Sequence, residues 1–181
     1  MSTTYVALLR GINVGGRNKV RMADLAAAFR AHGLADVRTY IASGNVLFSS
    51  DEPDRATLSC DVEALLSREF GLDTVVALRS HEELRRIVAE APAGFGTAPR
   101  DQLCDVLFLL PPLTPGDVLA QLSLREGVDE AAAGTDVVYF GRLAARRTQS
   151  RLSHIMSLPL YRHLTIRSWG TTTRLLALLE A

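Results

Sequence analysis

The sequence predicts an α+β fold of two tandem ferredoxin-like (βαββαβ) subdomains, the second followed by a C-terminal helix. Three observations predict this fold. Strand and helix patterns in the first half follow the order βαββαβ, the same order returns in the second half, and a helical pattern with a loop, GFGTAPRD, separates the halves. We expect a first subdomain at residues 1–79, a helical linker at 80–103, and a second subdomain with its C-terminal helix at 104–181.

Hydrophobic periodicity places the elements of the first half. Gly33 and Gly71 stand where each expected helix should end, since glycine readily adopts the left-handed conformation there. The first strand is apolar on both sides, which a half-solvated antiparallel sheet would not show. We therefore expect another part of the chain to cover its second face. The expected strands are residues 4–10, 37–43, 45–50 and 73–79, and the expected helices are residues 22–32 and 54–70.

Two registers are open for the hairpin around Gly44. A tight turn at Gly44 is the direct interpretation, because glycine and asparagine tolerate positive φ. A short hairpin is then expected at the opposite end of the sheet from the loop that follows the first strand. If the turn instead lies before Tyr40, ASGNVLF forms a strand and places Ser43 and Asn45 on one face near the first strand.

The second half repeats the order of elements, which predicts a structural duplication. The prediction depends on element order alone, and a single mixed sheet is the alternative. Thr171 is expected to cap the final helix. The expected strands are residues 104–110, 128–132, 136–142 and 164–169, and the expected helices are residues 81–91, 115–124, 150–157 and 171–180.

Composition indicates a globular protein, with 48% hydrophobic residues and 20 acids against 20 lysines and arginines. The N-terminal sequence lacks the features of a secretion signal, and no run reaches the length of a membrane span. We therefore expect a cytoplasmic protein with no membrane partner. Cys60 and Cys104 are expected to be small core residues and not a disulfide.

Charge is segregated along the chain, although its total is zero. Residues 51–136 carry 17 acids against 7 arginines, whereas residues 137–179 carry 7 arginines and no acid. If the basic C-terminal part meets the basic loop near the N-terminus, the two would form one positive surface. Alternation of charges in the folded protein is the competing interpretation.

The loop RGINVGGRNK, residues 10–19, is the best candidate binding segment. It resembles the phosphate-binding P-loop in its glycine spacing, but Arg17 and Asn18 replace the lysine and hydroxyl residue that a P-loop needs, so nucleotide hydrolysis is excluded. The corresponding segment of the second half, LPPLTPGD, has three prolines and no base. The fold itself therefore does not require a glycine-rich basic loop. Such a loop could form an amide nest for an anion, or it could be a mobile surface loop.

Other common chemistries lack their residues. The four histidines are scattered, no metal-ligand spacing is present, and we expect neither a metal nor a cofactor. The basic run at residues 142–151 lacks the interleaved aromatic residues of a single-strand platform, and the RNA-recognition signature is missing. Trp169 could stack on a planar ligand beside Arg167, although packing is the commoner role of a tryptophan.

Four segments resemble the bacterial domain of unknown function family 1697. They are YVALLRGINVGGRNKVRM and VRTYIASGNVLFSS near the N-terminus, and SRLSHIM and TIRSWGTTT near the C-terminus. Ser168 and Gly170 replace two asparagines of the family's last signature, which leaves Arg167 and Trp169 as its matching side chains. The resemblance implies tandem ferredoxin-like subdomains and no activity.

The leading hypothesis is a protein that binds a phosphate-bearing ligand, a nucleotide, RNA or other short nucleic acid, at a cleft between the halves. An enzyme acting on a small anionic metabolite and a protein-interaction or homodimer module are the alternatives, and no general base is identifiable. The candidate ligand-binding residues are Arg10, Gly11, Asn13, Gly15, Gly16, Arg17, Lys19, Ser43, Asn45, Arg167 and Trp169.

Overall fold

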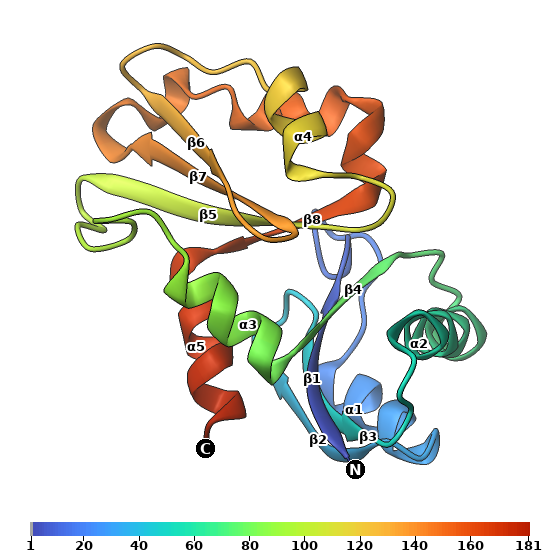
Figure 1. Cartoon of the computed structure of the whole chain (residues 1–181). Coiled ribbons are helices and arrows are strands. Elements are labelled where there is room, and N and C mark those ends of the chain that lie inside the picture. The colour runs from blue at the N-terminus through green and yellow to red at the C-terminus, as the bar shows by residue number, and fades with distance from the viewer. Residues whose placement is uncertain (1) are drawn as a thin grey trace. The chain divides into compact units, whose positions relative to one another are not determined.

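The computed structural model describes residues 2–181, which form two four-stranded antiparallel sheets with helices and end in a C-terminal helix (Figure 1). The chain divides into two compact units. The first comprises the residues up to Leu84 together with Leu175–Ala181, and the second comprises Arg85–Arg174. The expected subdomain limits and the linker at residues 80–103 stay predictions.

The first unit contains the sheet β2-β3-β1-β4, in which all neighbours are antiparallel. The chain then enters a third helix directly after the last strand. The elements are β1 (Thr3–Leu9), α1 (Met22–Ala31), β2 (Ala35–Tyr40), β3 (Asn45–Ser50), α2 (Arg55–Phe70), β4 (Val76–Ser80) and α3 (His81–Ala89).

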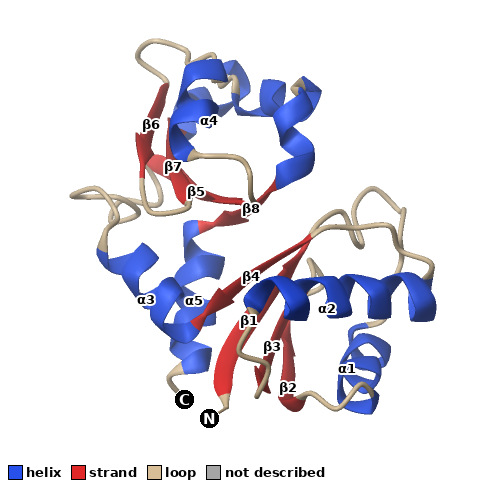
Figure 2. Ribbon diagram, turned by 45° about the vertical axis from the view of Figure 1, so that its right-hand side comes forward, coloured by secondary structure: helices blue, strands red, loops and turns tan. Residues whose placement is uncertain are grey.

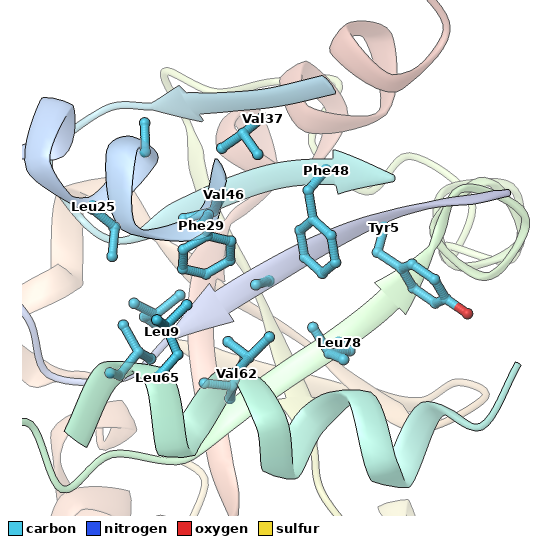
Figure 3. Close-up of a cluster of buried hydrophobic side chains, with 14 of the residues drawn as sticks. Tyr5, Leu9, Leu25, Phe29, Val37, Val46, Phe48, Val62, Leu65 and Leu78 are labelled. Atoms are coloured by element: carbon cyan, nitrogen blue, oxygen red, sulfur yellow. The ribbon is translucent and has the colours of Figure 1, made fainter. Parts of the chain in front are cut away.

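One face of the first sheet is covered by α1 and α2 (Figure 2). Phe29 of α1 meets Phe48 of β3 edge to face at 5.6 Å, and Val62 of α2 points into the same interior (Figure 3). On the opposite face Val6 and Leu8 are fully buried. The prediction that this second face is covered is therefore confirmed.

The second unit contains the sheet β6-β7-β5-β8, so the alternative of a single mixed sheet is wrong. Three short 3-10 helices stand between β7 and β8. The elements are β5 (Gln102–Leu109), α4 (Pro115–Gln121), β6 (Asp129–Ala133), β7 (Val137–Leu143), the 3-10 helices Ala144–Gln149, Leu152–Ser157 and Pro159–His163, β8 (Leu164–Ser168) and α5 (Trp169–Leu179).

Both sheets pair their strands in equivalent registers. Val6 of β1 pairs with Arg79 of β4, and Val106 of β5 pairs with Arg167 of β8. Just beyond, the amide of Leu9 donates to the Gly44 carbonyl at 2.8 Å in the first unit, as Leu109 does to Asp136 at 3.1 Å in the second. The repetition extends to individual backbone hydrogen bonds.

The helix expected near residues 150–157 is present as a 3-10 helix, Leu152–Ser157, and it ends where the extended backbone of Leu158 precedes Pro159. Two other local predictions are wrong. The final helix begins at Trp169, where the Ser168 hydroxyl, not Thr171, accepts the helix amide. Cys60 is exposed on α2, whereas Cys104 is buried as expected.

Candidate functional site

The loop after β1 and the β2–β3 turn lie at the same end of the first sheet, so the expectation that they lie at opposite ends is wrong. Leu8 near the end of β1 pairs with Asn45 at the start of β3. The crossover through α1 makes β2 run in the same direction as β1, so the C-terminal ends of both strands lie at the same end of the sheet. The turn occupies residues 41–44, so the strand expected to reach Ser43 ends at Tyr40, and the alternative with the turn before Tyr40 is wrong.

The basic loop folds as a miniature hairpin. The main-chain amide of Asn13 donates to the main-chain carbonyl of Asn18 at 3.1 Å, and the main-chain amide of Arg17 donates to the Val14 carbonyl at 3.0 Å. Gly15 and Gly16 form its tip with φ of 58° and 77°, and two successive positive φ values are typical of a type I′ hairpin turn. The turn therefore accounts for Gly15 and Gly16, because both positions have positive φ.

The side chain of Asn13 holds the base of this hairpin. Its Oδ1 accepts the Val20 amide at 2.8 Å, and its Nδ2 donates to the Val20 carbonyl at 3.0 Å and to the Ala42 carbonyl at 2.8 Å. Asn13 itself has a φ of 53°, which asparagine tolerates better than most residues. One carboxamide thus fastens the loop to the neighbouring turn.

The turn is packed against the loop as well. A β-carbon at Gly44, whose φ is 82°, would lie 2.8 Å from Ile12 Cδ1 and 3.0 Å from Leu9 Cβ. Asn45 is fully buried, and its Nδ2 donates to the Tyr40 carbonyl at 3.0 Å and to the Ser43 hydroxyl at 3.1 Å. Ser43 and Asn45 therefore build the turn that supports the loop.

Two of the three basic side chains in the loop face solvent. Arg17 and Lys19 are exposed, and Arg10 is half-buried, with its carbonyl accepting the Thr74 hydroxyl at 2.6 Å. No atom would lie within 4 Å of a β-carbon at Gly11, Gly15 or Gly16, so the space beside these three glycines is open. The hairpin therefore combines positive charge with an approachable backbone.

Arg167 and Trp169 belong to the second unit, whereas the other candidate residues belong to the first. Arg167 is 7% exposed and donates to the Thr165 hydroxyl and the Ile166 carbonyl, both at 2.9 Å; burial lowers its pKa to about 10, so it stays charged at neutral pH. Trp169 packs edge to face on Phe95 at 5.1 Å.

Two supporting residues were not among the predicted site residues. Asn18 donates from Nδ2 to the Gly11 carbonyl at 3.0 Å and has a φ of 49°, and Thr74 ties the start of the loop to the segment before β4. For Asn18 a sequence signal was present, because asparagine is enriched at turn positions with positive φ. For Thr74 there was none, since its contact joins residues 64 apart.

Across residues 2–181, no group of three or more histidine, cysteine, aspartate or glutamate side chains is gathered closely enough to hold a metal ion. None of the helices in that range has the length and apolar character required to cross a membrane.

Comparison with known proteins relates the chain to a family and to a solved structure. The model of the family described as "Protein of unknown function (DUF1697)" matches residues 2–139. A conserved bacterial protein from Streptococcus pneumoniae has a similar structure, with a TM-score of 0.86, 29% sequence identity and 99% of each chain covered. No curated protein matches the chain. The family match ends before the two C-terminal segments, while the structural match includes them.

Proposed function

For this chain, which belongs to the DUF1697 family of proteins of unknown function, we propose that the hairpin at residues 10–19 binds a phosphate-bearing ligand, a nucleotide or a short nucleic acid. The observation that carries the proposal is the fixed hairpin itself, which presents exposed Arg17 and Lys19 beside open glycine backbone. No acid stands between residues 10 and 23, so nothing in the segment neutralises these charges.

The hydrogen bonds that order the hairpin favour the interpretation as an anion site, as opposed to a mobile surface loop. Binding costs less when the donors are already ordered, and the two carboxamides of Asn13 and Asn18 hold the hairpin through four hydrogen bonds to the backbone. Arginine and lysine donors form charge-assisted hydrogen bonds with phosphate oxygens, and these are stronger than neutral ones. We assign the direct contacts to Arg10, Arg17, Lys19 and the amides of Gly15 and Gly16.

The remaining candidate residues take supporting roles in this proposal. Ser43 and Asn45 fix the turn against which the hairpin packs, and Gly11 and Asn13 fix its base. Arg167 is buried in the second unit and Trp169 packs on Phe95, so we infer that these two residues shape their own unit and do not contact the phosphate.

A thermal-shift panel tests the proposal. Inorganic phosphate, ATP and a short single-stranded RNA are added at low and at high salt to the wild type, to Arg17→Gln/Lys19→Gln, and to Arg21→Gln as the matched control, since Arg21 is exposed and pairs with Asp24. A ligand at 100 times its Kd adds about 2.7 kcal/mol to the stability of the folded state. We expect a shift in the wild type and the control and none in the double variant.

Two results would overturn the proposal: no probe shifts the wild type, or the double variant shifts as much as the wild type. Salt separates the ligand classes: RNA binding should weaken steeply at high salt, because the release of counterions from RNA is then less favourable, whereas binding of a compact nucleotide should be less sensitive.

A protein-interaction or homodimer surface is the second candidate, and exposed apolar side chains favour it. Val14 at the hairpin is 63% exposed and Ile41 in the neighbouring turn is 49% exposed. Light scattering of the wild type and of Val14→Ser at several concentrations tests this: self-association lost in the variant would favour the dimer. Catalysis on a small anionic metabolite, through the same donors, is the remaining alternative.

We further infer that the two units are tandem ferredoxin-like subdomains and that the protein works in the cytoplasm. The shared strand order and the matching registers support the first inference. The two unpaired cysteines agree with the reducing compartment of the second. Limited proteolysis followed by mass spectrometry would map the subdomain limits. Fractionation of cells would show whether the protein is found in the cytoplasm.

A further inference from the structure

A pocket on the second sheet lies wholly within the second unit. It has a volume of about 200 Å³, which is below the usual range for drug-sized ligands and fits a fragment-sized molecule. Its walls come from three neighbouring strands and from the loop before β5. The lining residues are Pro92, Ala93, Gly94, Phe95, Gln102, Glu130, Ala131, Ala132, Tyr139 and Gly141.

Small residues create the hollow. Gly141 of β7 pairs with Glu130 of β6, and Ala132 pairs with Tyr139, so the floor between the longer side chains is a glycine and an alanine. Glycine inside a strand is unfavourable for the strand itself and is common where another group approaches closely. A β-carbon at Gly141 would lie 2.7 Å from Gln102 Nε2, which shows that the amide of Gln102 leans over this glycine.

Aromatic rings form one wall and are fixed in place. Phe95 meets Tyr139 edge to face at 5.4 Å and Trp169 at 5.1 Å. Tyr139 is 1% exposed and donates its hydroxyl to the Ile87 carbonyl at 2.6 Å. Burial, with the charge of Glu90, raises the pKa of Tyr139 to about 12, so its ring stays neutral at physiological pH.

The loop carrying Phe95 is held at both ends of its turn. The Phe95 amide donates to the Pro92 carbonyl at 2.9 Å, and the Thr97 amide donates to the Gly94 carbonyl at 3.2 Å. Gly96 packs so closely on Trp169 that a β-carbon there would lie 2.0 Å from the indole Cδ1. The pocket is therefore preformed.

The polar side of the pocket is acidic. Gln102 Nε2 lies 3.4 Å from Glu130 Oε2, which is a long contact and leaves the carboxylate with further acceptor capacity. Glu130 is the one charged residue among those that line the pocket. The lining of the pocket therefore favours a cation.

From this arrangement we propose that the pocket binds a small organic cation, an ammonium or amidinium group on a short apolar or aromatic body. The cationic group meets the Glu130 carboxylate and the Gln102 amide oxygen, and the body lies over Ala132 against Phe95, beside the Gln102 side chain that covers Gly141. A cation near the faces of aromatic rings is attracted by their quadrupole, and a carboxylate adds a charge-assisted hydrogen bond. The site is independent of the loop at residues 10–19.

An NMR titration of the isotope-labelled full chain tests the proposal. Phenethylamine is the cationic probe, and phenethyl alcohol and hydrocinnamate are its neutral and anionic counterparts. We expect saturable shifts from phenethylamine confined to residues 92–95, 102, 130–132, 139 and 141, with about tenfold weaker binding of the alcohol and none of the acid.

Variants separate the pocket from general charge effects. Glu130→Gln removes the carboxylate at an exposed position and should weaken phenethylamine about tenfold, while Glu126→Gln, an exposed residue outside the pocket with the same charge change, should stay within about twofold. Gly141→Ala places a β-carbon 2.7 Å from Gln102 Nε2, so the Gln102 amide must move and all probes should bind more weakly. Absence of saturable shifts, equal binding of the alcohol and the amine, or unchanged binding in Glu130→Gln would overturn the proposal.

Discussion

Ile12 and Gly44 interlock the two N-terminal segments of this protein: the isoleucine lies where any β-carbon at position 44 would come within 2.8 Å of its Cδ1. Ile12 is 1% exposed, so it has little room to move away. The contact joins GIN of the loop to SGN of the turn. It explains why position 44 is a glycine.

Gly44→Ala should destabilise the protein by about 2–4 kcal/mol, because a positive φ costs a side chain about 1 kcal/mol or more and overpacking adds about 1–3 kcal/mol. Gly15→Ala is the matched control, since Gly15 also has positive φ but open space around it. It should cost about 1 kcal/mol. Chemical denaturation of both variants measures the difference, and equal losses would show that packing on Ile12 contributes nothing.

Asn13→Ala should cost about 2–3 kcal/mol, because it removes three hydrogen bonds to backbone groups. Asn13→Asp should not restore stability, since a carboxylate keeps the acceptor for Val20 but turns an oxygen toward two carbonyls. Hydrogen exchange of the Val20 amide reports the same clamp. If Asn13→Asp were as stable as the wild type, this role for the carboxamide would be contradicted.

Arg142→Met should make stability strongly dependent on pH. Arg142 Nη1 lies 2.6 Å from Asp105 Oδ2, and burial raises the pKa of Asp105 even beside this arginine. A carboxyl whose pKa is raised in the folded state stabilises that state when it is protonated. This stabilisation is fully present below the pKa of the unfolded chain, about 3.9, and is lost as the pH rises through the higher pKa of the folded protein.

Arg142→Met should therefore lower the free energy of unfolding by about 2–4 kcal/mol at pH 7. The decrease should be much smaller near pH 4, where Asp105 binds a proton. Arg142→Met combined with Asp105→Leu should recover most of the stability at pH 7, because no carboxylate is then left at this position in the interior. Denaturation curves at both pH values check this. A loss that is equal at pH 4 and pH 7 would contradict it.

Ser168→Ala should cost about 1 kcal/mol, since the Ser168 hydroxyl accepts the Thr171 amide at 3.2 Å at the start of α5. Thr171→Ala keeps that acceptor and should cost less. Ser80→Ala at the equivalent strand end of the first unit offers a further comparison, because Ser80 accepts the Glu83 amide, also at 3.2 Å. Thermal denaturation of the three variants ranks the caps, and a larger loss in Thr171→Ala than in Ser168→Ala would reverse the assignment.

Much of the secondary structure could be predicted because its signals are local. Apolar periodicity located α2, and Gly71 with φ of 63° ends it. The same periodicity would have placed Cys60 on the outer side, since it stands two residues after buried Leu58. Pro159 likewise indicated that a helix before it would end by Ser157, because the residue before a proline disfavours helical backbone.

The site was less accessible from the sequence because its contacts are between distant residues. The loop and the turn meet only through the crossover of α1, and their hydrogen bond joins Asn13 to a carbonyl 29 residues later. The pocket on the second sheet depends on the register of β6 against β7, which no single segment encodes. The basic residues of the loop could be identified from the sequence, whereas the contacts with the turn that hold the loop in place could not.

The first unit is discontinuous: its sheet is made from the first half of the chain, yet it includes Leu175–Ala181, and the Arg38 guanidinium donates to the Leu178 carbonyl at 2.7 Å. During synthesis, the ribosome must therefore produce the whole second unit before the residues that complete the first become available. The contacts of these last residues with the first sheet can therefore form only after the second unit has been synthesised.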